Sequence, residues 1–285
     1  MQSKRIGRAS IFNSLQQKYI RNNYLSMSYK DIANALGFSE RQIRGWVNNH
    51  CPRKNRVFNS DVFHKIDTSE KAYWLGYIYA DGWISRHKRN HSDSADDFTY
   101  EFGMELHCGD RCVLEQLNHF LGGKHLIQDR TRKLVIANNQ HESIVHTSTI
   151  RVYSKRLVED LCRNGIDYNK TYSDRIIDIR QDLFPDFLRG YIDGDGCVCE
   201  QHDGRYIVVH ITAFGTSMLE YIKEILLQSY GILSSIYSEG DRKHRLVVFN
   251  QDSVKALFDL IYYSDNIPYL DRKYKKFTSF YGLAA

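Results

Sequence analysis

Two short segments of the chain repeat one pattern, and each carries an aspartate near its end. Residues Tyr73–Trp83 read YWLGYIYADGW and residues Phe187–Cys197 read FLRGYIDGDGC, so both contain G-Y-I-x-[AG]-D-G. The two aspartates, Asp81 and Asp195, are 114 residues apart. Carboxylate oxygens are preferred ligands of hard divalent cations. The repeat therefore predicts a metal site, provided that the fold brings the two aspartates together.

Small residues within the segments predict how the aspartates meet. Gly76 and Ala80 in the first segment, and Gly190 and Gly194 in the second, are four residues apart. On a helix this spacing places both small residues on one face. Two such faces allow the backbones of two helices to approach closely. We therefore expect the two halves of the chain to pack helix against helix about a pseudo-twofold axis.

The ends of these two helices are expected to bind Mg²⁺. Asp81 and Asp195 would lie at the carbonyl end of each helix, which is the negative pole of the helix dipole. Because the two carboxylates also repel each other, a divalent cation would stabilise the arrangement. The predicted ligands are these two carboxylates and the backbone carbonyl groups of Ala80 and Gly194. Mn²⁺ or Ca²⁺ is expected to substitute for Mg²⁺ in binding.

Further residues mark the expected limits of the two helices. Asp67 and Glu70 form a candidate capping pair before the first helix. Pro185 suits the first turn of the second helix. Gly82 and Gly196 are predicted to adopt the left-handed conformation that commonly follows a helix end.

The sequence downstream of each segment predicts the same order of elements. In the first half, apolar periodicity predicts strands at 98–106, 125–136 and 143–153, and helices beginning at Asp110 and Ser154. In the second half it predicts strands at 206–212, 234–237 and 245–249, and helices at 217–228 and 253–263. Each half is interpreted as helix, two strands, helix, two strands, helix (αββαββα). The expected fold class is α+β with mostly antiparallel sheets, because the connections are short.

Positive charge is concentrated at the start of the chain. Residues 1–66 contain 12 Lys and Arg against 3 Asp and Glu, a net charge of +9, whereas residues 67–285 contain 27 against 31, a net charge of −4. A small basic head on a nearly neutral body favours a module that binds phosphates. No apolar run approaches the roughly 18 residues that span a membrane, so a membrane partner is not expected.

The basic head has the pattern of a helix-turn-helix. In residues 29–48, YKDIANALGFSERQIRGWVN, apolar residues at helical spacing lie on both sides of Gly37. Ser39 is expected to cap the second helix, and an earlier helix over 12–25 would complete a three-helix unit. The second helix of such a unit enters the major groove of DNA. The predicted DNA contacts are Arg41, Gln42 and Arg44 on this helix and Arg53, Lys54 and Arg56 after it.

The six cysteines are interpreted as reduced thiols, because none belongs to a C-x-x-C pair and no secretory signal is recognised. Cys197 and Cys199 would share one face of a strand, and Cys108 and Cys112 one face of a helix. A zinc site made from these pairs is an alternative that the spacing leaves open.

The two repeated segments resemble the LAGLIDADG motif of homing endonucleases, and the resemblance extends over about residues 58–280. Residues Gly165–Lys170 (GIDYNK) resemble the G-x-x-x-x-K segment that closes the first half in this family, and Tyr269–Lys273 (YLDRK) resembles the L-x-R-K segment that closes the second. The doubled motif resembles the single-chain, pseudo-symmetric branch. The chain departs from the family pattern at Trp74, Leu75, Tyr79 and Arg189, none of which is a presumed metal ligand.

The resemblance implies a fold and an activity. The two antiparallel sheets would form a saddle over duplex DNA, and Asp81 and Asp195 would hold Mg²⁺ at the two scissile phosphates. Hydrolysis of both strands would leave 3′ overhangs. Lys170 and Lys273 would be the basic residues that polarise water or stabilise charge on the phosphate. The expected domains are the helix-turn-helix with its basic linker (1–56), the first LAGLIDADG half (57–176) and the second half (177–285).

Two other functions of the same fold stay open at this point. One is a DNA-binding regulator that does not cleave, and the other is an RNA maturase. For the endonuclease, the expected partner is double-stranded DNA with a long, mostly asymmetric target site, bound by a monomer. The expected compartment is the cytoplasm or nucleoid of a bacterial or phage-infected cell, or an organelle matrix.

Overall fold

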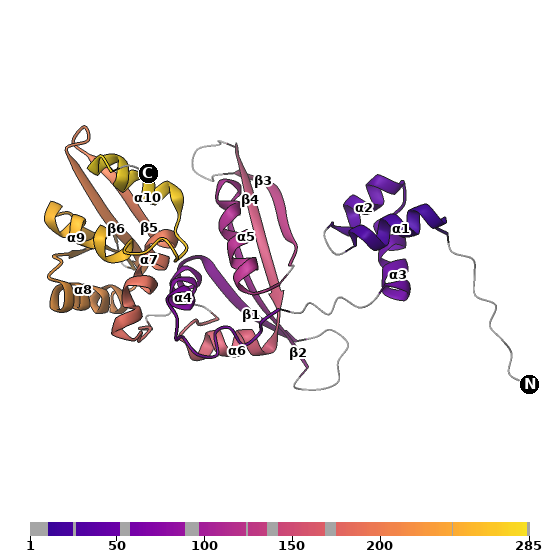
Figure 1. Ribbon diagram of the computed structural model, residues 1–285, viewed down its shortest axis with the longest axis horizontal. Coiled ribbons are helices and arrows are strands. Elements are labelled where there is room, and N and C mark those ends of the chain that lie inside the picture. The colour runs from indigo at the N-terminus through magenta and orange to yellow at the C-terminus, as the bar shows by residue number, and fades with distance from the viewer. Residues whose placement is uncertain are drawn as a thin grey trace, which may run out of the picture. The chain divides into compact units, whose positions relative to one another are not determined.

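The computed structural model describes residues 11–24, 27–51, 58–88, 97–123, 125–135, 142–168, 175–240 and 242–283 (Figure 1). The chain forms two compact units, one from residues 1–58 with 122–126 and the other from residues 59–121 with 127–285. Within the described ranges, no helix is both long enough and apolar enough to cross a membrane.

The N-terminal unit contains the three expected helices, α1 (Ser14–Asn23), α2 (Tyr29–Leu36) and α3 (Glu40–His50). Gly37 separates α2 from α3 and has φ of +72°, the left-handed conformation that glycine adopts without steric cost. Side chains from all three helices meet in one small core, which includes Ile20, Ile32, Ile43 and Trp46. The apolar periodicity on both sides of the glycine therefore specified a packed helical unit.

The body of the protein consists of two halves with the same order of elements. The first half contains α4 (Ser69–Asp81), β1 (Gly82–Lys88), β2 (Phe98–His107), α5 (Arg111–Phe120), β3 (Ile127–Val135), β4 (Glu142–Tyr153) and α6 (Lys155–Arg163). The second contains α7 (Phe184–Asp195), β5 (Gly196–Gln201), β6 (Tyr206–Phe214), α8 (Ser217–Tyr230), β7 (Ser235–Ser238), β8 (Lys243–Val248) and α9 (Gln251–Ile261). A further helix, α10 (Asp271–Tyr281), follows. The predicted α+β class and the αββαββα order are confirmed.

The two sheets also share one topology. Their strand orders are β1-β2-β4-β3 and β5-β6-β8-β7, and every neighbouring pair is antiparallel. In each sheet, alternate residues of the long strand are buried in the core: Phe102, Met104 and Leu106 in β2, and Ile207, Val209 and Ile211 in β6. We call the opposite face of each sheet its outer face. It carries polar residues such as Glu105 in β2 and His210 in β6.

The repeated helices α4 and α7 pack against each other through their glycines. A side-chain carbon on Gly76 would overlap the carbonyl oxygen of Phe187 and lie 2.9 Å from its carbonyl carbon. A carbon on Gly190 would overlap the carbonyl oxygen of Tyr73 and lie 2.9 Å from its carbonyl carbon. Tyr73 and Phe187 are 114 residues apart, as are the two glycines. The two contacts are therefore equivalent under the expected pseudo-twofold symmetry.

The pseudo-twofold axis passes next to the predicted metal site. A side-chain carbon on Gly194 would overlap the Cβ of Ala80 and lie 3.6 Å from its Cα. Ala80 and Gly194 are also 114 residues apart, and equivalent residues can touch only near the axis that relates them. Each residue directly precedes one of the two aspartates, so Asp81 and Asp195 lie on either side of this axis.

The glycines after α4 and α7 do not adopt the predicted conformation. Gly82 has φ −77° and ψ 159°, and Gly196 has φ −80° and ψ 157°, so both are extended and each begins a strand. They are glycines for a different reason. A side-chain carbon on Gly82 would lie 2.8 Å from the carbonyl oxygen of Ile78, and one on Gly196 would lie 2.8 Å from the Cα of Ile192. The close turn from helix to strand excludes a side chain.

The start of α4 also differs from the prediction, whereas that of α7 agrees. The hydroxyl of Thr68 accepts a hydrogen bond from the backbone N–H of Lys71 at 3.3 Å, so Thr68 is the N-cap and the predicted pair of Asp67 and Glu70 is wrong. Asp67 instead accepts a hydrogen bond from Lys71 Nζ at 2.7 Å. Pro185 lies in the first turn of α7, where its missing N–H costs nothing.

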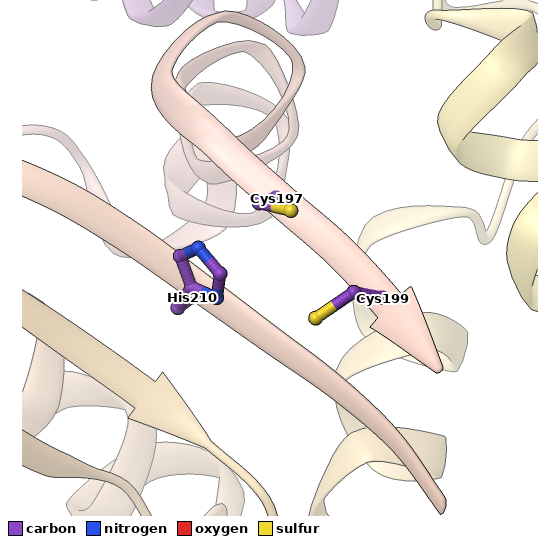
Figure 2. Close-up of side chains that lie close together, drawn as sticks. All are labelled: Cys197, Cys199 and His210. Carbon is purple, nitrogen blue, oxygen red and sulfur yellow. The ribbon is translucent and has the colours of Figure 1, made fainter. Parts of the chain in front are cut away.

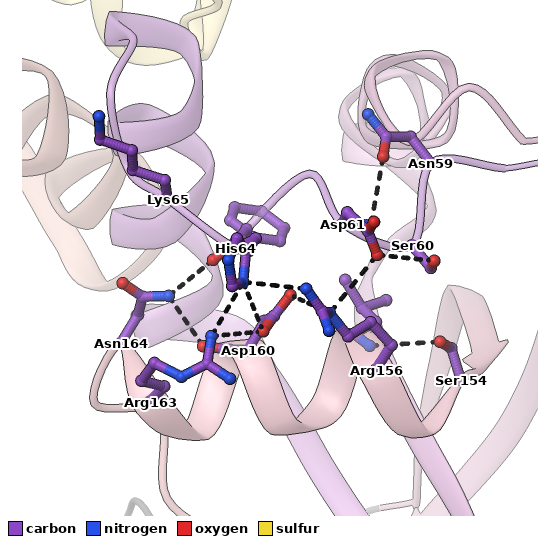
Figure 3. Close-up of polar contacts among 12 residues, drawn as sticks. Asn59, Ser60, Asp61, His64, Lys65, Ser154, Arg156, Asp160, Arg163 and Asn164 are labelled. Carbon is purple, nitrogen blue, oxygen red and sulfur yellow. Dashed lines mark hydrogen bonds and ion pairs between the residues drawn. The ribbon is translucent and has the colours of Figure 1, made fainter.

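A polar network fixes the segment that enters the body (Figure 3). Asp160 in α6 is fully buried, and its carboxylate accepts hydrogen bonds from Arg163 at 2.6 Å and Arg156 at 3.2 Å. The Nδ1 atom of His64 lies 3.4 Å from the same carboxylate. Asn164 donates to the carbonyl group of Phe63 at 2.7 Å. The residues just before α4 are thus held against α6.

We expect Gly76→Ala and Gly190→Ala each to lower the free energy of unfolding by about 3 kcal/mol, at the upper end of what overpacking usually costs. The reason is that each added methyl group meets rigid backbone of the partner helix. Chemical denaturation of the full chain, followed by circular dichroism, measures the loss.

The matched control is Gly45→Ala, because Gly45 lies inside α3 and a side-chain carbon there meets nothing within 4 Å. This change should leave stability unaltered or raise it by roughly 0.5–1 kcal/mol. Wild-type stability of Gly76→Ala would contradict the close approach of α4 and α7.

Candidate metal site and DNA interface

The two predicted metal-binding aspartates lie at adjoining helix ends. Asp81 is the last residue of α4 and Asp195 the last residue of α7. The Oδ2 atom of Asp81 lies 3.2 Å from the position that a side-chain carbon on Gly194 would occupy, so this carboxylate reaches the residue before Asp195. Asp81 is partly exposed and Asp195 is exposed. The structure therefore brings the predicted pair together at a place that solvent can reach.

The residues around the aspartates suit a hard cation. The nearest donors are two carboxylates from different helices, at the negative poles of both helix dipoles. The absent side chain at Gly194 leaves the space into which the Asp81 carboxylate extends. Oxygen donors of this kind fit Mg²⁺, Mn²⁺ or Ca²⁺ and not a soft metal.

The backbone carbonyl group of Gly194, a predicted metal ligand, also accepts a hydrogen bond from a lysine. The carbonyl oxygen of Gly194 accepts a hydrogen bond from Lys273 Nζ at 3.1 Å. A carbonyl oxygen has two lone pairs, so this bond leaves one of them for a metal ion. Ala80 is buried where α4 meets α7.

Lys273, a predicted catalytic residue, closes the C-terminal end of α7. Its side chain is 3% exposed, and Nζ also donates hydrogen bonds to the carbonyl groups of Ile192 at 2.7 Å and Asp193 at 2.6 Å. Burial lowers the pKa of Lys273 to about 8, and the nearby Asp193 carboxylate opposes this shift. A cation at the carbonyl end of a helix stabilises its dipole. Lys273 thus holds the last turn of α7 just before Asp195.

Asp193 joins α7 to both α4 and the start of α10. Its Oδ2 atom accepts hydrogen bonds from the Tyr73 hydroxyl at 3.0 Å and from the backbone N–H of Leu270 at 2.8 Å. Burial raises the pKa of Asp193 to about 6, and the charge of Lys273 opposes this shift. The end of α7 is therefore fixed by a buried charge network.

Arg189, which departs from the family pattern, anchors the segment between α9 and α10. It is fully buried, and its guanidinium group donates to the carbonyl groups of Ile261, of Ser264 at 3.2 Å and of Ile267 at 3.1 Å. The same group lies 5.2 Å from the ring centre of Tyr262. This anchoring positions the segment that carries Lys273.

An ion pair connects the two halves near the site. Arg272 donates from Nε and from Nη2 to the two carboxylate oxygens of Asp110, each at 3.0 Å. Asp110 was expected to open α5, but the helix begins at Arg111 and the Asp110 side chain makes no capping bond. Its carboxylate is directed to Arg272 instead.

The predicted DNA-binding residues of α3 are exposed. Gln42 also closes a capping box, because its side-chain oxygen accepts a hydrogen bond from the backbone N–H of Ser39 at 2.9 Å. Its S-x-x-Q spacing is the signal that could have indicated this role. Arg44 forms an ion pair with Glu40, and Arg41 is exposed on the same helix. Lys170, Arg53, Lys54 and Arg56 lie outside the described residues.

The outer faces of both sheets carry cations that pair with carboxylates. On the first sheet, Arg151 lies 3.1 Å from Glu101, and Arg132 pairs with Glu105. On the second, Arg245 lies 2.6 Å from Glu239. Arg132 and Arg151 lie on the neighbouring strands β3 and β4, a proximity that sequence periodicity alone could not show. Glu101 is buried, whereas the pairs of Arg132 and Arg245 are partly exposed. Ion pairs that solvent reaches contribute little to stability, so Arg132 and Arg245 can exchange partners.

The comparisons with known proteins agree with this architecture. Residues 186–262 match the family model of a LAGLIDADG-like domain. A comparison with curated protein sequences gives no significant match. The structure of I-SmaMI bound to uncleaved DNA target in the presence of calcium ions is similar with a TM-score of 0.50 and 14% identity, over 76% of this chain and 90% of that one.

A second solved structure has the same level of similarity. The LAGLIDADG homing endonuclease I-GzeII in complex with its DNA target has a TM-score of 0.50 and 11% identity, over 74% of this chain and 88% of that one. The resemblance that the second repeated segment indicated is thus confirmed for residues 186–262. The fold of the body is similar to that of these two structures, one of which is a LAGLIDADG homing endonuclease.

We expect Lys273→Met to lower the free energy of unfolding by roughly 3–5 kcal/mol, because it removes one partner of a buried ionic network. The carbonyl groups of α7 lose their donor, and Asp193 loses its cation. Urea denaturation at pH 7 measures the effect.

The control is Lys275→Ala on the same helix. Lys275 pairs with Asp271 at exposed positions, where an ion pair contributes less than about 1 kcal/mol. If the two variants lost the same small amount, Lys273 would not support α7 as described.

Proposed function

We propose that this protein is a site-specific endonuclease that hydrolyses phosphodiester bonds in double-stranded DNA with a divalent metal ion. The observation that carries the proposal is the meeting of Asp81 and Asp195 at the ends of α4 and α7, beside the pseudo-twofold axis. Two strands of a duplex are themselves related by a twofold axis. A pair of acids placed on either side of such an axis suits the two scissile phosphates of opposite strands.

Asp81 and Asp195 would hold Mg²⁺, with the carbonyl groups of Ala80 and Gly194 as further oxygen donors. When bound, the ion supplies Lewis-acid stabilisation of charge on the phosphate and lowers the pKa of water. The two side chains would fix the position of the reaction, since the packing of α4 against α7 sets where the two helices end. I-SmaMI, whose fold is similar, was solved bound to its DNA target in the presence of calcium ions, which supports a hard cation as the metal.

The lysines would act beside the carboxylates. Lys273 donates a hydrogen bond to the carbonyl group of the residue before Asp195. It therefore holds the last turn of α7, and its first contribution is to position Asp195. Catalytic participation of Lys273 and Lys170, by polarising water or stabilising phosphate charge, is part of the proposal.

The outer faces of the sheets would contact DNA. Their arginines, among them Arg132 and Arg245, now pair with partly exposed carboxylates. Backbone phosphates attract the same groups, which explains how a body with a net charge of −4 can bind a polyanion. Two proteins with this fold were solved bound to DNA, which supports DNA as the partner.

The N-terminal unit would bind DNA next to the cleavage site through α3. Both units belong to one chain, so the DNA contacts of α3 would be tethered to the body. Such tethering raises affinity through effective concentration.

Because the two halves of the chain are not identical, the protein would act as a monomer on a mostly asymmetric target. Cleavage of both DNA strands at the pair of aspartates would leave 3′ overhangs. The protein would act where such DNA lies, in a bacterial or phage-infected cell or an organelle. A regulator or a maturase needs no paired acids at the helix ends. For that reason the endonuclease is favoured over both.

We predict that Asp81→Asn and Asp195→Asn each abolish double-strand cleavage and leave DNA binding within about twofold, because an amide keeps the shape but removes the charge that holds a cation. The substrate is a duplex selected from a randomised library for Mg²⁺-dependent cleavage, with a chelator control. Gel electrophoresis measures cleavage, and fluorescence anisotropy in Ca²⁺ measures binding. Glu200→Gln, an exposed acid in β5, is the matched control and should cleave normally. Normal cutting by either aspartate variant would sink the assignment.

We predict that Arg41→Ala weakens DNA binding by the full-length protein. If Arg41 contacts a phosphate, the slope of log K against log salt should fall by about 0.9. If it contacts a base, discrimination at one position of the target should fall by about 1–3 kcal/mol. The control is Lys223→Ala, which removes an exposed cation from α8, a helix that we do not expect to contact DNA. Identical affinity, slope and specificity in wild type and Arg41→Ala would show that α3 does not contact DNA.

A further inference from the structure

A cluster of three potential metal ligands lies on the outer face of the second sheet. Cys197 and Cys199 extend from β5, and His210 extends from the neighbouring strand β6 (Figure 2). Their ligand atoms all lie within 4.8 Å of one another, and each residue is partly buried. Among the described residues, no other group of three or more His, Cys, Asp and Glu side chains meets this criterion.

The strand register produces the cluster. Cys197 pairs directly with His210 across β5 and β6. Cys199 is two residues further along β5, and residues two apart on a strand project from the same face. Val198, between the cysteines, is buried on the core side. The backbone alone therefore directs all three side chains to one side of the sheet, and a rearrangement of the fold is not needed.

We propose that Cys197, Cys199 and His210 bind a Zn²⁺ ion. Thiolate sulfur and imidazole nitrogen are the ligands that Zn²⁺ favours, at about 2.3 Å and 2.0 Å. Two sulfurs at tetrahedral angles around such an ion lie about 3.8 Å apart. Small side-chain rotations bring ligand atoms that already lie within 4.8 Å to that separation. Three protein ligands leave the fourth position to water.

The charge balance also suits zinc. As the two Zn–S bonds form, each thiol releases its proton to solvent, so two thiolates, a neutral imidazole and Zn²⁺ have no net charge. Two cations lie near the cluster, and one of them, Arg245, is paired with Glu239. Lys276 Nζ donates to the carbonyl group of Val198 at 2.8 Å, and Arg245 also acts electrostatically on Cys199. A zinc site with no net charge is compatible with these two cations. A metal ion held only by neutral ligands would keep its positive charge and be repelled by them.

The zinc site is chemically separate from the pair of aspartates. Asp195 is only two residues before Cys197, but carboxylates select hard cations whereas thiolates select softer ones. The zinc proposal therefore does not rest on the proposed endonuclease activity, and either can fail without the other.

The test uses the full-length protein, purified with a phosphine reductant and stripped of metal, and titrated with Zn²⁺ against a chromophoric chelator. We expect one zinc bound per chain and two protons released per zinc. Co²⁺ as a probe should give sulfur-to-cobalt charge-transfer absorption and the intense visible bands of a tetrahedral site. Excess Mg²⁺ should not displace either metal.

Variants locate the site. Loss of a group that only orients a ligand costs about 10–100-fold in metal affinity, so Cys197→Ser, Cys199→Ser and His210→Gln should each cost more than about 100-fold. The matched control is Cys108→Ser with Cys112→Ser, which removes two exposed thiols from the other half and should change nothing. Asp81→Asn with Asp195→Asn should also retain zinc. Circular dichroism of each variant confirms folding.

The outcomes are decisive. Absence of stoichiometric zinc binding by the folded wild type overturns the proposal, and so does wild-type affinity in the three ligand variants. Cobalt spectra without charge transfer from sulfur overturn it too, since they would place the metal on oxygen or nitrogen ligands. Zinc binding that is lost with the Asp81 and Asp195 pair would assign the ion to the carboxylates instead.

Discussion

The close approach of α4 and α7 is the contact on which the rest of the body depends. At Gly76 and Gly190 there is no room for a methyl group between the glycine and a carbonyl oxygen of the partner helix. This packing fixes the separation of the helix ends, and with it the separation of Asp81 and Asp195. Because each helix leads directly into the first strand of a sheet, the same contact also fixes where the two sheets lie relative to the aspartates.

The pseudo-symmetry is broken where the two helix ends differ in chemistry. Tyr73 donates to Asp193 at 3.0 Å, but at the equivalent place the rings of Tyr79 and Phe187 pack with centres 6.2 Å apart. Asp193 thus places a buried carboxylate near Lys273, two residues before Asp195, whereas the equivalent residue before Asp81 is the aromatic Tyr79. A buried ionic group is costly unless all partners are in place. The two helices are therefore not interchangeable, even though their glycine contacts are equivalent.

Sequence patterns predicted the elements that have their own apolar period, and missed those that depend on tertiary contact. The long strand β2 and the helices α8 and α9 follow alternating or helical apolar patterns and were found within a few residues. The short strands β1 and β5 had no predicted range. Each follows a helix directly, and the glycine at the junction is the only residue there that indicates a boundary. The helix α10 was also not predicted. Its buried face combines the charged Lys273 with the aromatic Phe277, so it lacks a regular apolar period. The Lys273 contacts join residues about 80 positions apart, beyond any local pattern.

The candidate site shows the same division. Residue type and a repeat of 114 positions were enough to select Asp81 and Asp195, because hard-cation chemistry needs carboxylates and symmetry says where the second one lies. The Cys197–Cys199 pair could be seen in the sequence, but its third partner could not. His210 is distinguished from the other histidines only by the register of β5 and β6. Where a strand directly follows a helix, two residues that are two positions apart can belong to different elements. Oxygen ligands at the helix end and sulfur ligands on the strand can therefore lie side by side without competing for the same ion.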